Sequence, residues 1–255
     1  MKELEPLERL DEVNDFLRLI QKTDGLTFGT DALLLAAFVR GNRKYRAIEF
    51  GAGSGIISLL CAARGKAGKI LAVEAQQSYA ELTRRNISEN NLGNIIEVAC
   101  VDLRDTKSYG GDDCDLIFTN PPYMTVTGGY PNKNEAKNIA RHEVLGGISD
   151  FCRAAASKLR YGGHLYCVYR PDRITDLLAA MRESRIEPKR MTVVTASHAS
   201  VPSLVLVEGK RGGSPGLVFT PPLFLYRDET HTAYSDEMNY ILEHGSFMDR
   251  EVYEK

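Results

Sequence analysis

The sequence predicts an α/β fold in which a mostly parallel sheet is covered by helices on both faces. From residue 46 to residue 207, short apolar runs of strand length alternate with amphipathic stretches that fit helices of about 10–15 residues. This alternation is typical of parallel sheets, because neighbouring parallel strands need a long crossover connection, usually a helix. The chain of 255 residues is long enough for one domain with short additions at its ends.

Seven strands are expected in this region, with helices between most of them. The last two strands are joined by residues 196–202 without a helix, so they should run antiparallel to each other. The expected strands are residues 46–50, 69–74, 95–101, 115–119, 164–169, 191–195 and 203–208, and the expected helices are residues 55–63, 78–90, 149–159 and 173–184.

Shorter elements are expected on both sides of the sheet region. Residues 32–39 form an apolar helix, for which Thr30 or Asp31 is a natural N-cap. Near the other end, Pro221 and Pro222 restrict the chain to an edge strand at best. The remaining segments are a turn-rich loop at 209–216, the interrupted strand at 217–226 and an amphipathic helix at 235–244. Together these elements predict a single domain with an N-terminal cap at 1–45, a core at 46–210 and a C-terminal extension at 211–255.

Composition excludes several classes of protein. Hydrophobic residues make up 43% and charged residues 26%, which is typical of globular domains and not of disorder or a coiled coil. The longest uncharged apolar run, residues 32–39, is far shorter than the about 20 residues of a membrane span. The acidic segment 1–12 does not resemble a secretory signal. The five cysteines are widely spaced, so we expect reduced thiols in the cytoplasm, no disulfide and no metal site.

The charge distribution is compatible with an RNA substrate, although the net charge is −2. Residues 1–15 carry six acidic and two basic side chains, and residues 226–255 carry eight and three. The segment between them, residues 16–225, carries 27 basic and 20 acidic side chains. The excess of basic residues between two acidic ends could bind a polyanion. The alternative interpretation is a solvated surface of mixed charge, which fits the same numbers of charged residues.

A glycine-rich turn follows the first strand of the sheet region. Gly51, Gly53 and Gly55 allow tight turning and close approach of the backbone to a ligand. A dinucleotide fingerprint needs its third glycine at position 56, which is Ile56, so a pyrophosphate cradle is disfavoured. Glu49 is an acid just before this turn, and it suits a ligand with an amino group better than an anion. The alternative is a merely tight strand–helix turn.

Two further acids end the next two strands. Glu74 follows Gly51 by 23 residues, and a carboxylate at this position can accept hydrogen bonds from both hydroxyls of a ribose. Asp102 follows the third strand and could accept a hydrogen bond from the amino group of an adenine. Solvated strand ends are the alternative interpretation of both residues.

The strongest motif is Asn-Pro-Pro-Tyr at residues 120–123, directly after the fourth strand. It lies at the carboxyl edge, where open α/β sheets bind ligands. The prolines stiffen the turn, so that the Asn120 amide oxygen and the Pro121 carbonyl oxygen can accept both hydrogens of a planar amino group. Tyr123 offers a ring on which a flat base can stack. A proline-rich surface turn is the alternative.

These motifs, in this order, resemble the class I S-adenosylmethionine-dependent methyltransferases that methylate amino groups. That family implies a Rossmann-like sheet of seven strands, mostly parallel with one antiparallel strand and with helices on both faces. Within it, the segment 28–35 with Gly29, Thr30 and Asp31, the compact N-terminus and the tail after the sheet are similar to the valine-tRNA anticodon-loop adenine N6-methyltransferases. The resemblance covers nearly the whole chain.

The resemblance implies a role for each matching residue. The cofactor would be S-adenosylmethionine and the partner a nucleic acid, tRNA in particular. The implied cofactor contacts are Glu49, Gly51, Gly53, Gly55, Glu74, Asp102, Leu103, Asn120, and Thr30 with Asp31 on the N-terminal side. The implied catalytic residues are Asn120, Pro121 and Tyr123, and the implied substrate contacts are Pro122, Tyr123 and Arg141.

The implied reaction is in-line attack of an amine on a sulfonium methyl group, with no metal. Methylation of a protein glutamine amide ranks second, because that amide is also a planar amino group. Such enzymes usually carry a helical substrate domain, whereas only 47 residues precede Ile48. DNA adenine methylation ranks third, because no recognition domain is visible. An RNA-binding protein that has lost catalysis is disfavoured by the intact motif from Asn120 to Tyr123.

Overall fold

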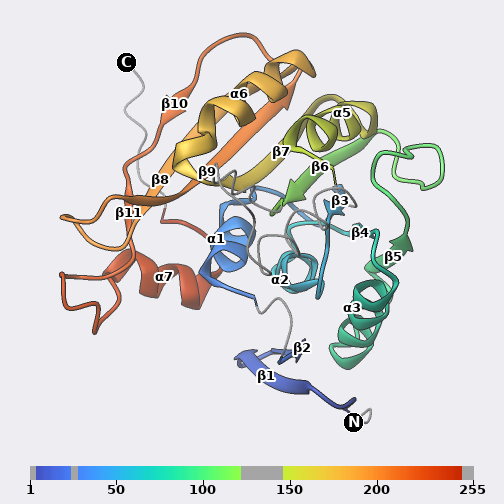
Figure 1. Cartoon of the computed structure of the whole chain (residues 1–255), viewed down its shortest axis with the longest axis horizontal. Coiled ribbons are helices and arrows are strands. Elements are labelled where there is room, and N and C mark those ends of the chain that lie inside the picture. Colours follow the sequence, from blue (N-terminus) through green and yellow to red (C-terminus); the bar gives the residue numbers. More distant parts are fainter. Residues whose placement is uncertain (1–3, 24–27, 122–145, 249–255) are drawn as a thin grey trace, which may run out of the picture.

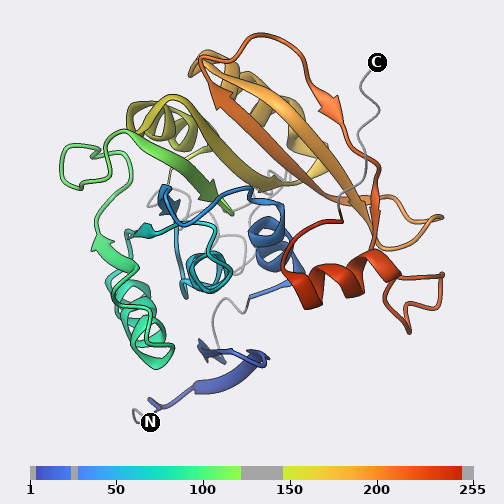
Figure 2. The same ribbon diagram turned by 180° about the vertical axis from the view of Figure 1, so that it is seen from behind.

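A central sheet with helices on both faces forms the body of the molecule (Figures 1 and 2). The computed structural model describes residues 4–23, 28–121 and 146–248. Its helices are α1 (Thr30–Phe38), α2 (Ile56–Ala63), α3 (Gln77–Glu89), α5 (Ile148–Lys158), α6 (Ile174–Glu183), α7 (Asp236–His244) and the 3₁₀ helix η1 (Pro171–Arg173). Its strands are β1 (Glu8–Asn14), β2 (Leu17–Lys22), β3 (Arg46–Phe50), β4 (Lys69–Glu74), β5 (Ile96–Cys100), β6 (Cys114–Thr119), β7 (Leu159–Tyr169), β8 (Ile186–Thr195), β9 (Pro202–Arg211), β10 (Val218–Phe219) and β11 (Leu223–Phe224).

The sheet has the predicted parallel core and terminal hairpin. Its strand order is β10-β8-β9-β7-β6-β3-β4-β5, with β11 also paired to β8. Strands β5, β4, β3, β6 and β7 are mutually parallel, and β9 runs antiparallel to both β7 and β8. The order places β3 at the centre, so the turn after β3 and the loop after β6 lie side by side at one edge.

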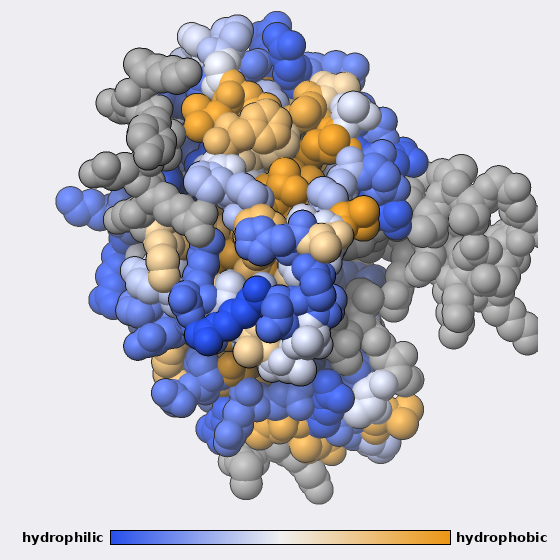
Figure 3. Space-filling view, turned by 90° about the vertical axis from the view of Figure 1, so that its left-hand side faces the viewer, coloured by the Kyte–Doolittle hydropathy of each residue, from blue (hydrophilic) through white to orange (hydrophobic). Residues whose placement is uncertain are grey.

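The predicted number of seven strands is wrong for the described part of the chain, where the sheet has nine. The two additions, β10 and β11, pair in parallel with β8 and cover its outer edge. Pro221 and Pro222 lie between them and lack the N–H groups of a continuous ladder, so the expected edge strand is split in two. Figure 3 shows this side, where apolar atoms gather among polar ones, and Val218 and Phe219 of β10 are among the exposed hydrophobic residues.

The two faces of the sheet bury separate hydrophobic clusters because side chains alternate along each strand. On β3, Ala47 joins the cluster under α1 and α2, whereas Ile48 and Phe50 join the cluster under α5 and α6. Glu49 therefore points to the face covered by α2.

An N-terminal β-hairpin, which the sequence did not indicate, packs against α3. Its strands β1 and β2 pair antiparallel. The Asn86 side chain mimics a strand partner for β2: it accepts a hydrogen bond from the Ile20 N–H at 2.7 Å and donates to the Ile20 carbonyl at 3.0 Å. The predicted cap at 1–45 thus contains this hairpin as well as α1.

Helix α1 begins two residues earlier than the predicted helix at 32–39. Its N-cap is Gly29, so the predicted N-cap at Thr30 or Asp31 is wrong, and both residues lie in the first turn. At the other end, Lys66 donates hydrogen bonds to the carbonyls of Ala36 and Val39 at 2.7 and 2.8 Å. A cation that binds the last carbonyls stabilises a helix and fixes its position.

Within the described residues, no helix is long and apolar enough to cross a bilayer. All five cysteines are free thiols, four of them buried, and Cys100 is half-buried.

Candidate functional site

The glycine-rich turn after β3 is open on one side and tightly packed on the other. Gly51, Gly53 and Gly55 have φ values of 69°, 57° and 80°, which L side chains rarely adopt. A Cβ atom at Gly53 would meet nothing within 4 Å, whereas one at Gly55 would lie 2.7 Å from the Thr83 Cγ2 atom. The turn therefore presents its backbone to open space at Gly53 and packs against α3 at Gly55.

Buried polar side chains of α3 hold this turn from behind. The Thr83 hydroxyl donates a hydrogen bond to the Gly53 carbonyl at 2.7 Å, and the Asn86 amide donates to the Ser54 carbonyl at 2.9 Å. Both side chains are fully buried. Sequence reasoning did not find these residues, although polar residues on the buried side of an amphipathic helix are a usable signal.

Glu49 lies beneath the turn and acts as a cap for α2. The N-cap residue Gly55 has no side chain, and the Glu49 carboxylate instead accepts hydrogen bonds from the Ser58 N–H at 2.9 Å and from the Ser58 hydroxyl. Burial raises the pKa of Glu49 to about 8, against the lowering effect of the Ser58 hydrogen bonds. The structure thus gives Glu49 a helix-capping role that the motif did not suggest.

Glu74 connects the end of β4 to the glycine-rich turn. Glu74 is 2% exposed, and its carboxylate accepts hydrogen bonds from the Gly53 N–H at 2.9 Å and the Gln76 N–H at 2.8 Å. A carboxylate has about four acceptor positions, so these two bonds leave capacity for hydroxyl donors. The predicted acid is therefore beside the predicted turn.

Asp102 and Leu103 follow β5 at the same edge of the sheet. Asp102 accepts hydrogen bonds from the Arg104 N–H and Nε at 2.8 and 2.9 Å, and the side-chain hydrogen bond to Arg104 lowers the pKa of Asp102. The Leu103 side chain is buried, and its carbonyl accepts a hydrogen bond from the Tyr109 hydroxyl at 2.8 Å. The loop is thus anchored while the Asp102 carboxylate remains partly exposed.

Asn120 meets the N-terminal segment at the end of β6. The Thr119 hydroxyl donates to the Phe50 carbonyl at 3.0 Å and fixes the end of β6 against the end of β3. The Asn120 amide nitrogen donates a hydrogen bond to the Asp31 carboxylate at 2.8 Å. Residues 89 positions apart in the sequence therefore form one cluster, which joins the predicted acceptor motif to the predicted N-terminal side of the pocket.

Most predicted site residues lie in the described part of the chain, at the carboxyl ends of β3, β4, β5 and β6 or at the start of α1. Three do not: Pro122, Tyr123 and Arg141 lie outside the described residues. No group of three or more His, Cys, Asp or Glu side chains within residues 4–23, 28–121 and 146–248 is arranged to hold a metal ion.

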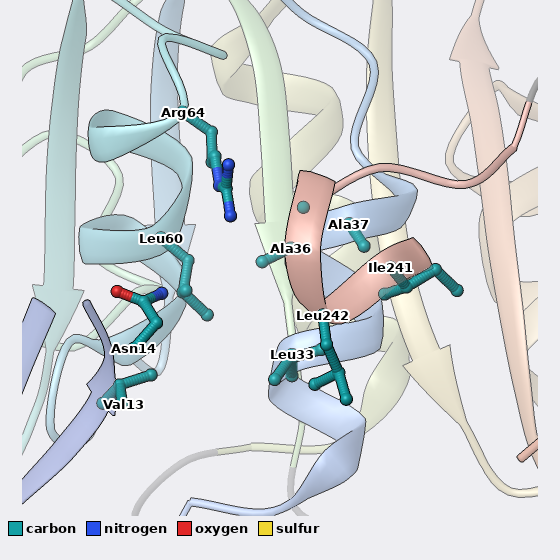
Figure 4. A pocket seen from close by; sticks show the side chains of 10 residues that line it. Val13, Asn14, Leu33, Ala36, Ala37, Leu60, Arg64, Ile241 and Leu242 are labelled. Atoms are coloured by element: carbon teal, nitrogen blue, oxygen red, sulfur yellow. The ribbon is translucent and has the colours of Figure 1, made fainter. Parts of the chain in front are cut away.

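A separate cavity of about 170 Å³ lies between the hairpin, α1, α2 and α7 (Figure 4). It is lined mainly by apolar side chains, and none of the predicted site residues borders it. Its lining residues are Val13, Asn14, Leu33, Ala36, Ala37, Leu60, Arg64, Ile241, Leu242 and Gly245.

The fold, with acids and a glycine-rich turn at the carboxyl edge of its sheet, is typical of α/β enzymes that bind nucleotide-like ligands. The family described as "Methyltransferase small domain" matches residues 22–184, and the chain belongs to this family. The prediction of a methyltransferase of the Rossmann-like class is therefore confirmed.

Relatives and solved structures agree with this membership. The "tRNA1(Val) (adenine(37)-N6)-methyltransferase" of Parabacteroides distasonis is 28% identical over 181 residues, which cover 71% of this chain and 75% of that protein. The protein of the same name from Pectobacterium carotovorum is 28% identical over 178 residues, 62% of this chain and 69% of that one.

Among solved structures, a predicted O-methyltransferase of Agrobacterium tumefaciens has a TM-score of 0.70 at 24% identity and covers 87% of this chain and 100% of its own. The TYW2 protein of M. jannaschii in complex with AdoMet has a TM-score of 0.55 at 16% identity and covers 81% and 86%. At these identities the likeness concerns the fold.

Proposed function

We propose that this chain transfers a methyl group from S-adenosylmethionine to N6 of an adenine in tRNA. The observation that supports this most is the placement of Asn120, which begins an Asn-Pro-Pro-Tyr motif at the end of β6, beside the glycine-rich turn. The names of the relatives state that they methylate N6 of an adenine in tRNA, and this supports the same reaction for this chain.

The turn after β3 and its neighbours suit S-adenosylmethionine. The backbone faces open space at Gly53, and the buried carboxylate of Glu74 lies next to it, as a ribose-binding acid should. When bound, S-adenosylmethionine supplies an electrophilic methyl group on a positively charged sulfonium. The carboxylates of Glu74 and Asp31 favour a cation at this edge of the sheet.

Each of the remaining contacts has a proposed partner on the cofactor. The glycine-rich turn, with Glu49 beneath it, would hold the amino-acid end, and Glu74 would accept hydrogen bonds from the ribose hydroxyls. Asp102 and the Leu103 backbone would bind the adenine of the cofactor. Thr30 and Asp31, in the first turn of α1, would close the pocket from the N-terminal side.

Asn120 and Pro121 would hold and orient the target amine. The lone pair of an adenine amine is delocalised into the ring, so the amine is a weak nucleophile. Hydrogen bonds to the Asn120 amide oxygen and the Pro121 carbonyl oxygen would turn the lone pair toward the methyl group. Such positioning can contribute several kcal/mol to catalysis. Tyr123 and Pro122 would contact the target base, and Arg141 a phosphate of the RNA.

The need to move the target base out of its stack into the site favours an RNA loop as the acceptor. An unpaired base in a loop can be splayed into a pocket at lower cost than a base in a duplex. The basic excess of residues 16–225 fits a polyanionic partner.

Single-turnover methylation with labelled S-adenosylmethionine tests the proposal. The full chain is incubated separately with unmodified tRNA, DNA and a protein fraction, and the product is identified by mass spectrometry. We expect N6-methyladenosine in tRNA, and a lower rate for N120A than for N42A, a matched control at the opposite edge of the sheet. Methylated glutamine or DNA as the main product, or a methyl group on a ring carbon or ribose oxygen, would overturn the proposed acceptor.

A further inference from the structure

We propose that Asp31 is a positioning residue that sets the orientation of the Asn120 carboxamide toward the methyl acceptor. This inference rests on the proposed function, because it assigns Asp31 a role in the same reaction. In this inference Asp31 acts by orienting Asn120, and not by contacting the cofactor directly.

The position of Asp31 is set by the start of α1. It lies in the first turn of α1, and one of its carboxylate oxygens accepts a hydrogen bond from the Ala32 N–H at 2.9 Å. Most residues of α1 are buried against the sheet and neighbouring helices, and Lys66 binds the carbonyls at its other end. The packing of α1 and the hydrogen bond from Ala32 therefore place the Asp31 carboxylate at the start of this helix.

The other carboxylate oxygen of Asp31 accepts the hydrogen bond from the Asn120 amide nitrogen at 2.8 Å. A carboxamide has a donor branch and an acceptor branch of nearly equal size, and only hydrogen bonding decides which branch points where. An ionised carboxylate accepts hydrogen bonds but cannot donate one. Asp31 therefore selects the rotamer in which the nitrogen faces α1 and the oxygen lies on the opposite branch.

This choice matters for the chemistry of the acceptor. In the selected orientation the Asn120 oxygen can accept a hydrogen from the target amine. In the flipped orientation the amide nitrogen of Asn120 would oppose the amino group of the target, and two donors would face each other. Asp31 thus favours the reactive arrangement without touching the reacting atoms.

The first test compares D31N and D31A with the wild type. An asparagine at position 31 can donate or accept, so it no longer selects one orientation of Asn120. A charge-assisted hydrogen bond of this kind corresponds to a loss of about 10- to 100-fold in kcat. We expect the dissociation constant of S-adenosylhomocysteine to change by less than about threefold. The control is D236N, because Asp236 lies in the first turn of α7 with a side chain that is 86% exposed.

The second test exchanges the two side chains. N120D places two acceptors where a donor and an acceptor now meet, so repulsion should displace the side chain and lower kcat strongly. When D31N is combined with N120D, the amide introduced at position 31 donates to the carboxylate introduced at position 120, whose second oxygen can accept from the target amine. We expect the exchanged pair to recover at least about tenfold in kcat over N120D alone, as the restored bond predicts.

The third test asks whether Asp31 acts through Asn120. In an N120A background, D31N should cause no further loss of kcat, because the group that it orients is gone. The inference would be overturned if the losses of kcat caused by D31N and by N120A were fully additive. An unchanged kcat for D31N, or no recovery of kcat when D31N is combined with N120D, would overturn it as well.

Failure of the proposed function gives a different result. In that case the wild-type chain methylates none of the offered acceptors. The unfolding midpoints of wild type, D31N, N120D and the exchanged pair then still measure the interaction between the two residues. Additive midpoint shifts in that cycle would overturn the inference without reference to activity.

Discussion

Replacement of Glu74 by alanine tests whether the end of β4 binds the cofactor. In the proposed complex, the Glu74 carboxylate accepts hydrogen bonds from two ribose hydroxyls in addition to the Gly53 and Gln76 N–H groups that it already binds at 2.9 and 2.8 Å. The two ribose bonds are charge-assisted, and their loss should cost about 2–3 kcal/mol of binding free energy. The dissociation constant should therefore rise by about 30- to 150-fold.

The same substitution should have a smaller effect on the folded state. The backbone borders open space at Gly53, so water can reach the Gly53 N–H when Glu74 is gone, and only about 1 kcal/mol of stability should be lost. For a chain of this length that corresponds to a fall of about 2–4 °C in Tm. Removal of the Glu74 charge also relieves its repulsion of Glu49, which should lower the raised pKa of Glu49.

Calorimetric titration with S-adenosylhomocysteine measures the predicted loss of affinity. E74Q keeps one carbonyl acceptor without the charge and should bind with intermediate affinity. E97A is the matched control, because Glu97 is an exposed acid on the neighbouring strand β5. An unchanged dissociation constant for E74A, with the expected loss of Tm, would show that Glu74 supports only the turn and not the ligand.

Three further predictions address catalysis, folding and pH. N120A should lower the single-turnover rate by about 10²–10³ with cofactor affinity nearly unchanged, because a contact that strengthens in the transition state is lost; a wild-type rate would refute this role. N86A removes three hydrogen bonds that the buried Asn86 side chain makes to the hairpin and the glycine-rich turn. The free energy of unfolding should therefore fall by about 3 kcal/mol and Tm by about 6–12 °C, and a thermal melt with a shift below about 2 °C would contradict that account. Burial alone would raise the pKa of Glu208, but His164 and Arg190 outweigh it and lower this pKa to about 2. The stabilisation by Glu208, about 3 kcal/mol, is therefore complete above pH 4.5 and lost as the pH falls toward 2. Unfolding midpoints between pH 5 and pH 2 should decline less steeply in E208Q than in the wild type, and parallel curves would refute the assignment.

The sequence by itself determined the parallel core of the sheet and the chemistry placed at its edge. Strand and helix periods are local properties, and so is the need for glycine at the positive φ values of Gly51, Gly53 and Gly55. Glu74 is the last residue of β4, Asp102 lies two residues after β5, and the motif at 120–123 directly follows β6. Because parallel strands end at one edge of a sheet, the strand order alone brings these residues together.

The sequence also predicted that residues 217–226 could form only an edge strand, for the local reason that proline lacks an N–H group. It did not show that the two halves of this segment would both pair with β8. Nor did it predict β1 and β2, whose docking depends on the Asn86 side chain of a helix far away in the sequence. Such pairings require partners that no local pattern identifies.

Only the tertiary structure decided how the side chains at the site are used. Glu49 was predicted to lie at the cofactor site, and its position on β3 places it under the glycine-rich turn, where it also caps α2. Asp31 was predicted as a possible N-cap, yet its carboxylate accepts a hydrogen bond from Asn120 at the end of β6. The sequence could indicate these positions as site candidates because local backbone geometry and chemistry select their residue types. Their hydrogen-bond partners were not, because a partner depends on which distant element the packed core brings within about 3 Å.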